Sequence, residues 1–385
     1  MGIYLDGHST TILAPEARSA MESAWEEGGN AQSPHFTGMR ASEAVERARM
    51  SVSQLIGAEI TEVIFTSGAT EANNLAILGV ARRLTSVNRP RIIVSSIEHK
   101  AVIEPALVLR AEGFEVIEAP VLRTGVVDLK ALSQLVNQRT LLVSLMLANN
   151  EIGVIQPVEQ AAALAHAAGA LVHSDCAQAL GRMPIDVAQL NVDYLSLSAH
   201  KCHGPMGVGA LYVAGGAPKP NALMHGGGQE EGIRPGTVPV ALCAGFGAAV
   251  DLARRHLAED SQHCATLVSR FAAVLAELGL NSRPTCVDSE HLPGSFSFRI
   301  PGLDADRLVD TLARDVYLST GSACNSGQLG PSHVLQAIGL SPQDARATLR
   351  VCFGRYNSSI DAELAAAHIA AACRAQGVAT GGGHQ

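Results

Sequence analysis

Short apolar runs alternate with longer helical patterns between about residues 15 and 255 of this chain. This alternation is typical of a parallel sheet covered by helices. The expected strands are 63–65, 91–95, 115–119, 141–147, 171–173, 194–197 and 210–213. The expected helices between them include 71–83, 101–112 and 158–168. The sequence therefore predicts an α/β fold built on a mostly parallel sheet.

The pattern changes after residue 240. A long helical segment over 240–280 is followed by isolated strands, at 295–300, 316–319 and 348–353, with helices between them. This second pattern predicts a smaller α+β domain. We expect a large domain over 15–258 and a small domain that combines 1–14 with 259–376. The glycine-rich tail 377–385 has little apolar surface to bury, so we expect it to be disordered.

Composition excludes several classes of protein. The 385 residues carry a formal net charge of −8 without a basic cluster, which argues against nucleic acid or an anionic membrane as partner. No apolar run approaches the roughly 18 residues of a membrane span, and the first residues lack a signal-peptide pattern. The eight cysteines include no Cys-x-x-Cys pair, so neither a disulfide framework nor a zinc ribbon is indicated. We expect a cytoplasmic protein.

A lysine stands in the segment SAHKCHGP (198–205), directly after a predicted strand. Lysine is rarely buried for packing, and the amine of Lys201 could form a Schiff base. Upstream, Asp175 ends another strand, with Gln178 three positions later. A carboxylate at a strand end, in a chain with such a lysine, is how proteins keep the ring nitrogen of pyridoxal phosphate protonated. The alternatives are a lysine in an exposed loop, or a metal site formed by its histidine and cysteine neighbours. That metal site would lack a second ligand cluster, so we expect no metal.

The segment TSGATEAN (66–73) follows the first predicted strand and opens a helix. Gly68 permits a tight turn, and the backbone N–H groups at a helix N-terminus bind phosphate. Thr70 adds a hydroxyl donor. A cofactor phosphate would therefore lie over residues 68–70. The alternative is an ordinary helix start with Ser67 as its N-cap.

Polar residues also follow the carboxyl ends of several predicted strands. Ligands of open parallel sheets bind at this edge, so such residues converge. The residues in question are His99, Asn149, Asn150, Asp175 and Lys201. A single histidine after a strand is usually structural, but five polar residues at equivalent positions predict one shared site.

Seven short motifs are distributed along the chain. They are TSGATE (66–71), EHK (98–100), NNEIG (149–153), SAHK (198–201), HGGGQ (225–229), RPGT (234–237) and GSAC (321–324). Together they resemble the cysteine desulfurases of the NifS and IscS group, which are fold-type I pyridoxal phosphate enzymes. The resemblance extends from Tyr4 to about Tyr356, nearly the whole chain.

The resemblance implies a role for each matching residue. Lys201 would bind the cofactor, Asp175 would pair with its ring nitrogen, and Gln178 would bond its phenolic oxygen. His99 would stack on the ring, and Asn150 would lie beside ring and substrate. The phosphate would be held by Ala69, Thr70, Ser198 and His200, joined by the partner subunit's Thr237 in a homodimer.

The resemblance also implies the reaction, conversion of L-cysteine to L-alanine. Arg350 would bind the substrate carboxylate, because a guanidinium fork meets two oxygens at once. The Lys201 amine would move the substrate's Cα proton. Cys324, in a segment of small and polar residues, would take the sulfur as a persulfide. A selenocysteine lyase, another pyridoxal phosphate reaction on this fold, and a non-catalytic sulfur-relay protein are the alternatives.

Several features depart from the family pattern. Cys176 stands where the family usually has alanine, and it is either a packing residue or a second redox-sensitive thiol. GHSTT (7–11) replaces the more usual SATT, and 30–33 lacks the customary proline. The C-terminal tail does not resemble the one that docks an iron-sulfur scaffold protein. The acceptor protein is therefore open among iron-sulfur cluster assembly, tRNA thiolation, cofactor synthesis and DNA modification.

Overall fold

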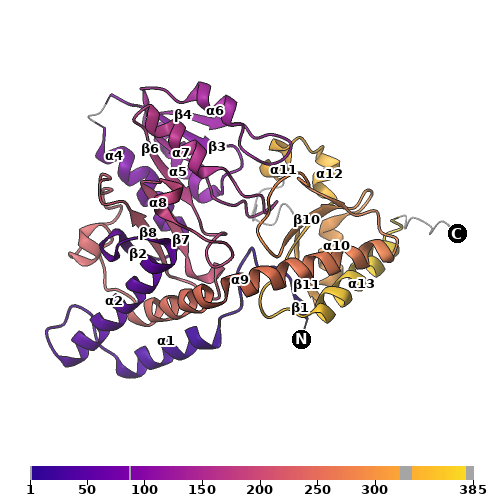
Figure 1. Ribbon diagram of the computed structural model, residues 1–385, viewed down its shortest axis with the longest axis horizontal. Coiled ribbons are helices and arrows are strands. Elements are labelled where there is room, and N and C mark those ends of the chain that lie inside the picture. Colours follow the sequence, from indigo (N-terminus) through magenta and orange to yellow (C-terminus); the bar gives the residue numbers. More distant parts are fainter. Residues whose placement is uncertain (1, 86–87, 321–331, 379–385) are drawn as a thin grey trace.

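The computed structural model describes residues 2–85, 88–320 and 332–378, arranged as two groups of strands joined by a long helix (Figure 1). Two predictions fall outside these residues. One is the placement of Cys324 with its GSAC motif, and the other is the disorder predicted for 377–385, as far as it concerns residues 379–385.

A seven-stranded sheet forms the centre of the larger part, in the order β2-β8-β7-β6-β5-β3-β4. Its strands are β2 (Val63–Thr66), β3 (Arg91–Ser95), β4 (Glu115–Ala119), β5 (Thr140–Ser144), β6 (Leu171–Asp175), β7 (Tyr194–Ser198) and β8 (Gly209–Val213). Strands β3 to β7 pair in parallel, whereas β8 runs antiparallel to both β2 and β7. The predicted α/β fold with a mostly parallel sheet is confirmed.

Helices pack around this sheet (Figure 1). They are α1 (Pro15–Glu27), α2 (Phe36–Ile56), α3 (Ala69–Asn74), α4 (Val80–Arg83), α5 (Lys100–Ala111), α6 (Leu129–Leu135), α7 (Val158–Ala167) and α8 (Val187–Leu190). A π-helical stretch, Leu75–Gly79, joins α3 to α4. The residues of β5, β7 and β8 are buried throughout, which explains why these strands have continuous apolar runs in the sequence. The prediction for β5 was too long, because the assigned strand ends at Ser144 rather than at residue 147.

The smaller part contains two further sheets. Strands β9 (Arg283–Pro284), β10 (Ser295–Arg299), β12 (Ser319–Thr320) and β13 (Thr348–Cys352) form an antiparallel sheet in the order β12-β13-β10-β9. Strand β1 (Ile3–Tyr4) pairs in parallel with β11 (Val316–Tyr317), so the chain's first strand joins its last third. The helices here are α10 (Ala305–Leu312), α11 (His333–Ala337), α12 (Pro342–Arg346) and α13 (Ser359–Ala375).

Helix α9 (Val240–Glu277) belongs to two hydrophobic cores. Its residues up to Leu252 pack in the core of the large sheet, and those from Leu267 pack with Leu5 and the C-terminal helix in another. We propose that the boundary between the two domains lies inside this helix, near residue 258. The disorder predicted for the tail was wrong for Val378, which is buried in the second core and whose N–H donates to the Cys373 carbonyl at 3.0 Å.

Within the ranges that the structure describes, no helix has the combined length and apolarity needed to cross a bilayer.

Candidate active site

A cavity of about 510 Å³ is lined by residues that follow the carboxyl ends of β2, β3, β5, β6 and β7. The structure brings nine of the predicted residues together there. They are Ala69, Thr70, His99, Asn150, Asp175, Gln178, Ser198, His200 and Lys201. The strands come from distant parts of the sequence, but parallel strands end at a common edge and so collect these side chains in one place.

Lys201 ends a 3-10 turn, Ala199–Lys201, that directly follows β7. Its Nζ donates to the backbone carbonyls of His8, at 2.5 Å, and Ser9, at 2.8 Å. Lys201 is half-buried, unlike a lysine in an exposed loop. The N-terminal segment therefore holds the amine at the cavity wall.

Asp175 is the last residue of β6 and is 6% exposed. Its Oδ2 accepts a hydrogen bond from Asn73 Nδ2 at 2.6 Å, and its Oδ1 accepts one from the Ala177 N–H at 2.9 Å. These donors orient the carboxylate from two sides. Sequence reasoning assigned Asn73 no role, although it closes the TSGATEAN segment, because its partner lies 102 positions away.

The turn before α3 has the form that phosphate binding requires. Gly68, with φ of 149°, occupies the N-cap position, and no side chain in the described part of the chain caps it, so the Ser67 alternative is wrong. A Cβ on Gly209 of β8 would lie 2.6 Å from Gly68 Cα, so the turn packs against bare backbone. Glu71 accepts from the Ser67 N–H at 2.6 Å and from Arg234 Nε at 3.1 Å, which joins the TSGATE and RPGT motifs.

Two histidines of the cavity are held neutral. His99 Nδ1 accepts from the Ala101 N–H at 3.1 Å at the start of α5, which leaves the ring proton on Nε2. Burial lowers the pKa of His99 below its usual value. His200 Nδ1 lies 3.1 Å from Thr10 Oγ1, and burial lowers the pKa of this histidine to about 4. Both rings can therefore contact a cofactor without adding positive charge at neutral pH.

Arg350, on β13, lies beside the cavity but is not among its lining residues. Its side chain is 2% exposed. Nη1 donates to the Asn150 carbonyl at 2.8 Å, and Nη2 donates to Asp6 Oδ1 at 2.9 Å and Ser9 Oγ at 3.0 Å. Its Nε is buried and has no hydrogen-bond partner among the described residues. Since Asn150 and Ser9 both line the cavity, the guanidinium lies directly behind its wall.

Two other predicted residues lie away from the cavity lining. The Asn149 side chain holds the backbone, because its Oδ1 accepts from the Glu151 and Ile152 N–H groups and its Nδ2 donates to the Ile97 carbonyl. Asn149 is therefore structural, and the prediction that all five strand-end residues share the site was wrong for this one. Thr237 is exposed and does not line the cavity of its own chain.

Some lining residues were not predicted from the sequence. The list comprises His8, Ser9, Ser67, Asn73, Ala101, Met146, Ala148, Ala177, Met206 and Gly207, whereas Gly68, which also lines the cavity, was predicted at the phosphate. His8 had a signal, because it lies in the departure GHSTT. Cys176, the other departure, is fully buried and burial raises its pKa, which favours the packing interpretation.

The residues present fit pyridoxal phosphate. The cavity offers a carboxylate at one strand end, an amine at another and an uncapped helix start at a third. These groups match the ring nitrogen, the aldehyde carbon and the phosphate of that cofactor.

Comparison with known proteins agrees with this geometry. The model of the family described as aminotransferase class-V matches residues 3–364. The chain belongs to this family. Members of the aminotransferase class-V family depend on pyridoxal phosphate. A cysteine desulfurase of Mus musculus is 39% identical over 371 residues, covering 94% of this chain and 80% of the relative.

Solved structures of the family are also similar. A structure described as a NifS-like protein superposes with a TM-score of 0.90 at 35% identity, covering 96% of this chain and 99% of the other. One described as SspA in complex with cysteine has a TM-score of 0.81 at 32% identity, covering 92% and 99%.

Proposed function

We propose that this protein is a cysteine desulfurase, which converts L-cysteine to L-alanine with pyridoxal phosphate and transfers the sulfur to Cys324 as a persulfide. The observation that carries the proposal is the convergence of Lys201, Asp175 and His99 on one cavity, with Arg350 directly behind its wall. The names of the similar proteins support the choice of cysteine as substrate.

The roles follow from what each side chain can do. When bound, the cofactor supplies an electron sink for the carbanion at the substrate's Cα. Lys201 would hold the cofactor, and its amine, at the cavity wall, would act as the base that removes the proton from the substrate's Cα. Asp175 keeps a proton on the ring nitrogen, and Asn73 orients the carboxylate for this contact.

Substrate binding falls to Arg350. Its Nη atoms are already engaged by Asp6, Ser9 and the Asn150 carbonyl, so the guanidinium plane is firmly held. A substrate carboxylate would gain a charge-assisted hydrogen bond from this group, most directly by replacing the Ser9 hydroxyl.

The sulfur step belongs to Cys324. Its thiolate attacks the substrate sulfur, and the C–S bond breaks with its electron pair left on the carbon, which takes up a proton and becomes the methyl group of alanine. The sulfur stays on the protein as a persulfide. The resemblance of GSAC to the family motif supports this role. A homodimer is part of the proposal, because Thr237 is exposed and suited to reach a partner's phosphate.

The decisive test uses Cys324→Ala, with Cys286→Ala as the control, because Cys286 is a half-buried cysteine that does not line the cavity. We expect Cys324→Ala to bind cofactor and cysteine, seen as a change in cofactor absorbance, but to form no persulfide. Alanine and sulfide production at the wild-type rate would contradict the assignment.

Selenocysteine lyase is the second candidate, because the same residues could act on the selenium analogue. Alanine formation is measured with cysteine and with selenocysteine at equal concentrations. Alanine from selenocysteine alone would replace the desulfurase proposal with that of a lyase.

A further inference from the structure

His8 is a buried residue of the cofactor cavity to which the proposed reaction gives no role. It is 1% exposed and lies in the segment between β1 and α1. Its ring and its backbone carbonyl both contact Gln178 of the same cavity. A histidine this deeply buried with both ring nitrogens engaged has a fixed orientation.

The hydrogen bonds determine which ring nitrogen of His8 carries the proton. Gln178 Nε2 lies 2.9 Å from the His8 carbonyl oxygen, and only the NH₂ end of the amide can donate to a carbonyl. The other end, Oε1, therefore faces His8 Nδ1 at 2.8 Å, and Nδ1 must donate to it. His8 Nε2 is then an acceptor, and takes the hydroxyl proton of Ser295 at 2.8 Å.

The surroundings keep His8 in this neutral form. Burial is the main cause that lowers the pKa of His8 far below its usual value, and the positive charges of Arg182, Arg350 and Lys201 add to it. Arg182 Nη1 is 3.4 Å from Nδ1, but it donates to Cys352 Sγ at 2.8 Å, and Nη2 donates to the Gly7 carbonyl at 2.6 Å. Nδ1–H thus remains directed at Gln178.

His8 also connects two residues that would touch the cofactor. Its carbonyl oxygen accepts from Gln178 Nε2 at 2.9 Å and from Lys201 Nζ at 2.5 Å, which fills both lone pairs of that oxygen. The Gln178 amide uses its oxygen and one N–H in hydrogen bonds with His8. Its second N–H remains for a group in the cavity that Gln178 lines.

We infer that His8 is a positioning residue, which pins the Gln178 amide so that its remaining N–H points at the phenolic oxygen of the cofactor. The inference rests on the proposed function, since it needs the cofactor in this cavity. Without the ring, the Gln178 amide keeps only its hydrogen bond to the backbone carbonyl of residue 8 and can pivot about that contact, so its remaining N–H is no longer directed at the phenolic oxygen. A donor lost from the phenolic oxygen destabilises the negative charge that this oxygen carries once the lysine-bound cofactor has lost its proton.

The test is a pH titration of the absorbance of the lysine-bound cofactor, recorded without substrate. We expect His8→Ala to move the midpoint up by about one pH unit, as loss of one hydrogen bond to a charged oxygen implies. His8→Leu should do the same and fills more of the space, so it serves if the alanine variant does not fold. His8→Gln restores an N–H donor and should return the midpoint toward the wild-type value.

A double variant separates positioning from a general loss of structure. Gln178→Leu should raise the midpoint at least as far as His8→Ala, and His8→Ala in the Gln178→Leu background should add no further shift. His256→Ala, at an exposed histidine of α9, should leave the midpoint unchanged.

The outcomes distinguish this inference from the proposed function. Wild-type midpoints in folded His8→Ala and His8→Leu, or additive shifts in the double variant, would overturn the role of His8 and leave the desulfurase proposal intact. A wild-type protein that binds no pyridoxal phosphate would overturn both.

Discussion

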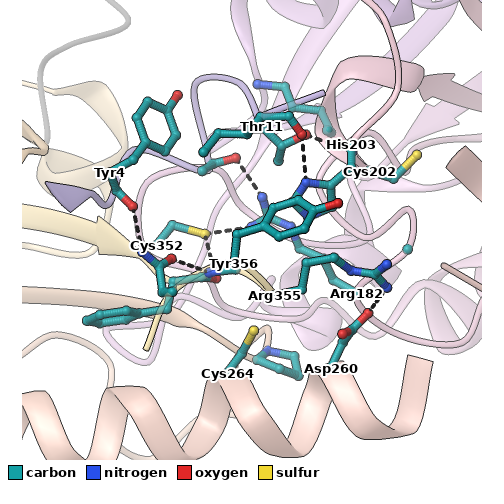
Figure 2. A pocket seen from close by; sticks show the side chains of 18 of the residues that line it. Tyr4, Thr11, Arg182, Cys202, His203, Asp260, Cys264, Cys352, Arg355 and Tyr356 are labelled. Carbon is teal, nitrogen blue, oxygen red and sulfur yellow. Dashed lines mark hydrogen bonds and ion pairs between the residues drawn. The ribbon is translucent and has the colours of Figure 1, made fainter. Parts of the chain in front are cut away.

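Two cavities of similar volume share Lys201 as part of their walls, yet only one of them has the chemistry of a catalytic site. The candidate active site measures about 510 Å³ and the second cavity about 540 Å³. The second, drawn in Figure 2, is formed by residues from both hydrophobic cores and from the N-terminal segment. Volume alone therefore does not identify where a reaction occurs.

Two arginines of the second cavity have partners within the protein, although Arg355 Nε has no hydrogen-bond partner among the described residues. Arg355 pairs with Asp260, and Arg182 donates to Cys352 Sγ and to the Gly7 carbonyl (Figure 2). Burial raises the pKa of Cys202 and of Cys264 to about 12, so these thiols stay protonated at neutral pH. The candidate active site differs because strand ends supply its polar groups, and these face a common space.

The largest effect is expected for Lys201→Ala, which tests whether the two cavities differ in function, because Lys201 lines both of them. We expect the absorbance of the lysine-bound cofactor to disappear and alanine formation to fall by about 10³-fold or more, because both the covalent link and the base are lost. Cys264→Ser, a change in the second cavity only, should keep both properties. A native cofactor spectrum in Lys201→Ala would contradict the site assignment.

A smaller effect tests whether tight packing at the wall of the second cavity contributes to the stability of the protein. Gly181 lines it with φ of +71°, and an added Cβ would lie 2.8 Å from Cys202 Cβ. We expect Gly181→Ala to lower the free energy of unfolding by about 3 kcal/mol, from backbone strain and overpacking together. Urea unfolding measures this loss, and the folded protein should bind cofactor normally.

Gly113→Ala is the matched control for that variant. Gly113 also has positive φ, +96°, but no heavy atom lies within 4 Å of its added Cβ in the part of the chain that the structure describes. Gly113→Ala should lower the free energy of unfolding by about 1 kcal/mol, from backbone strain alone. Equal losses in the two variants would show that crowding at the second cavity contributes nothing.

The smallest effect concerns the polar layer beside the candidate active site. His173 lies on β6, two residues before Asp175, between Ser144 Oγ at 2.8 Å and Ser196 Oγ at 3.0 Å. Burial lowers the pKa of His173 to about 4. The folded chain therefore keeps it neutral while the unfolded chain takes up a proton below about pH 6.5, so stability falls as pH drops from 6.5 toward 4.

Protonation of His173 in the unfolded chain should lower the free energy of unfolding by about 2 kcal/mol when the pH falls from 7 to 5. His173→Gln should lack that part of the pH dependence when unfolding by urea is compared at the two pH values. His256→Gln, at an exposed histidine, should retain it. An unchanged pH dependence in His173→Gln would mean that His173 is protonated in the folded protein.

Sequence patterns predicted most of the fold because local periodicity reports it directly. Strands β3 and β4 begin and end where expected, since each is a short apolar or alternating run bounded by turns. The long α9 was predicted as one segment, whereas its division between two cores was visible only in the packing. The end of β5 was misplaced because the apolar run continues past the strand into a buried loop.

Lys201, Asp175 and the turn at Gly68 could be proposed from the sequence because each has a local signature, a strand followed by a reactive or flexible residue. Asn73 and His8 could not be assigned, because their roles depend on partners 102 and 170 positions away. An amide or an imidazole has no function of its own until folding selects the group that it contacts. The sequence alone thus determined the fold class and the chemical groups of the site. The tertiary structure alone decided their neighbours, because hydrogen bonds between distant residues form only when the strand ends meet.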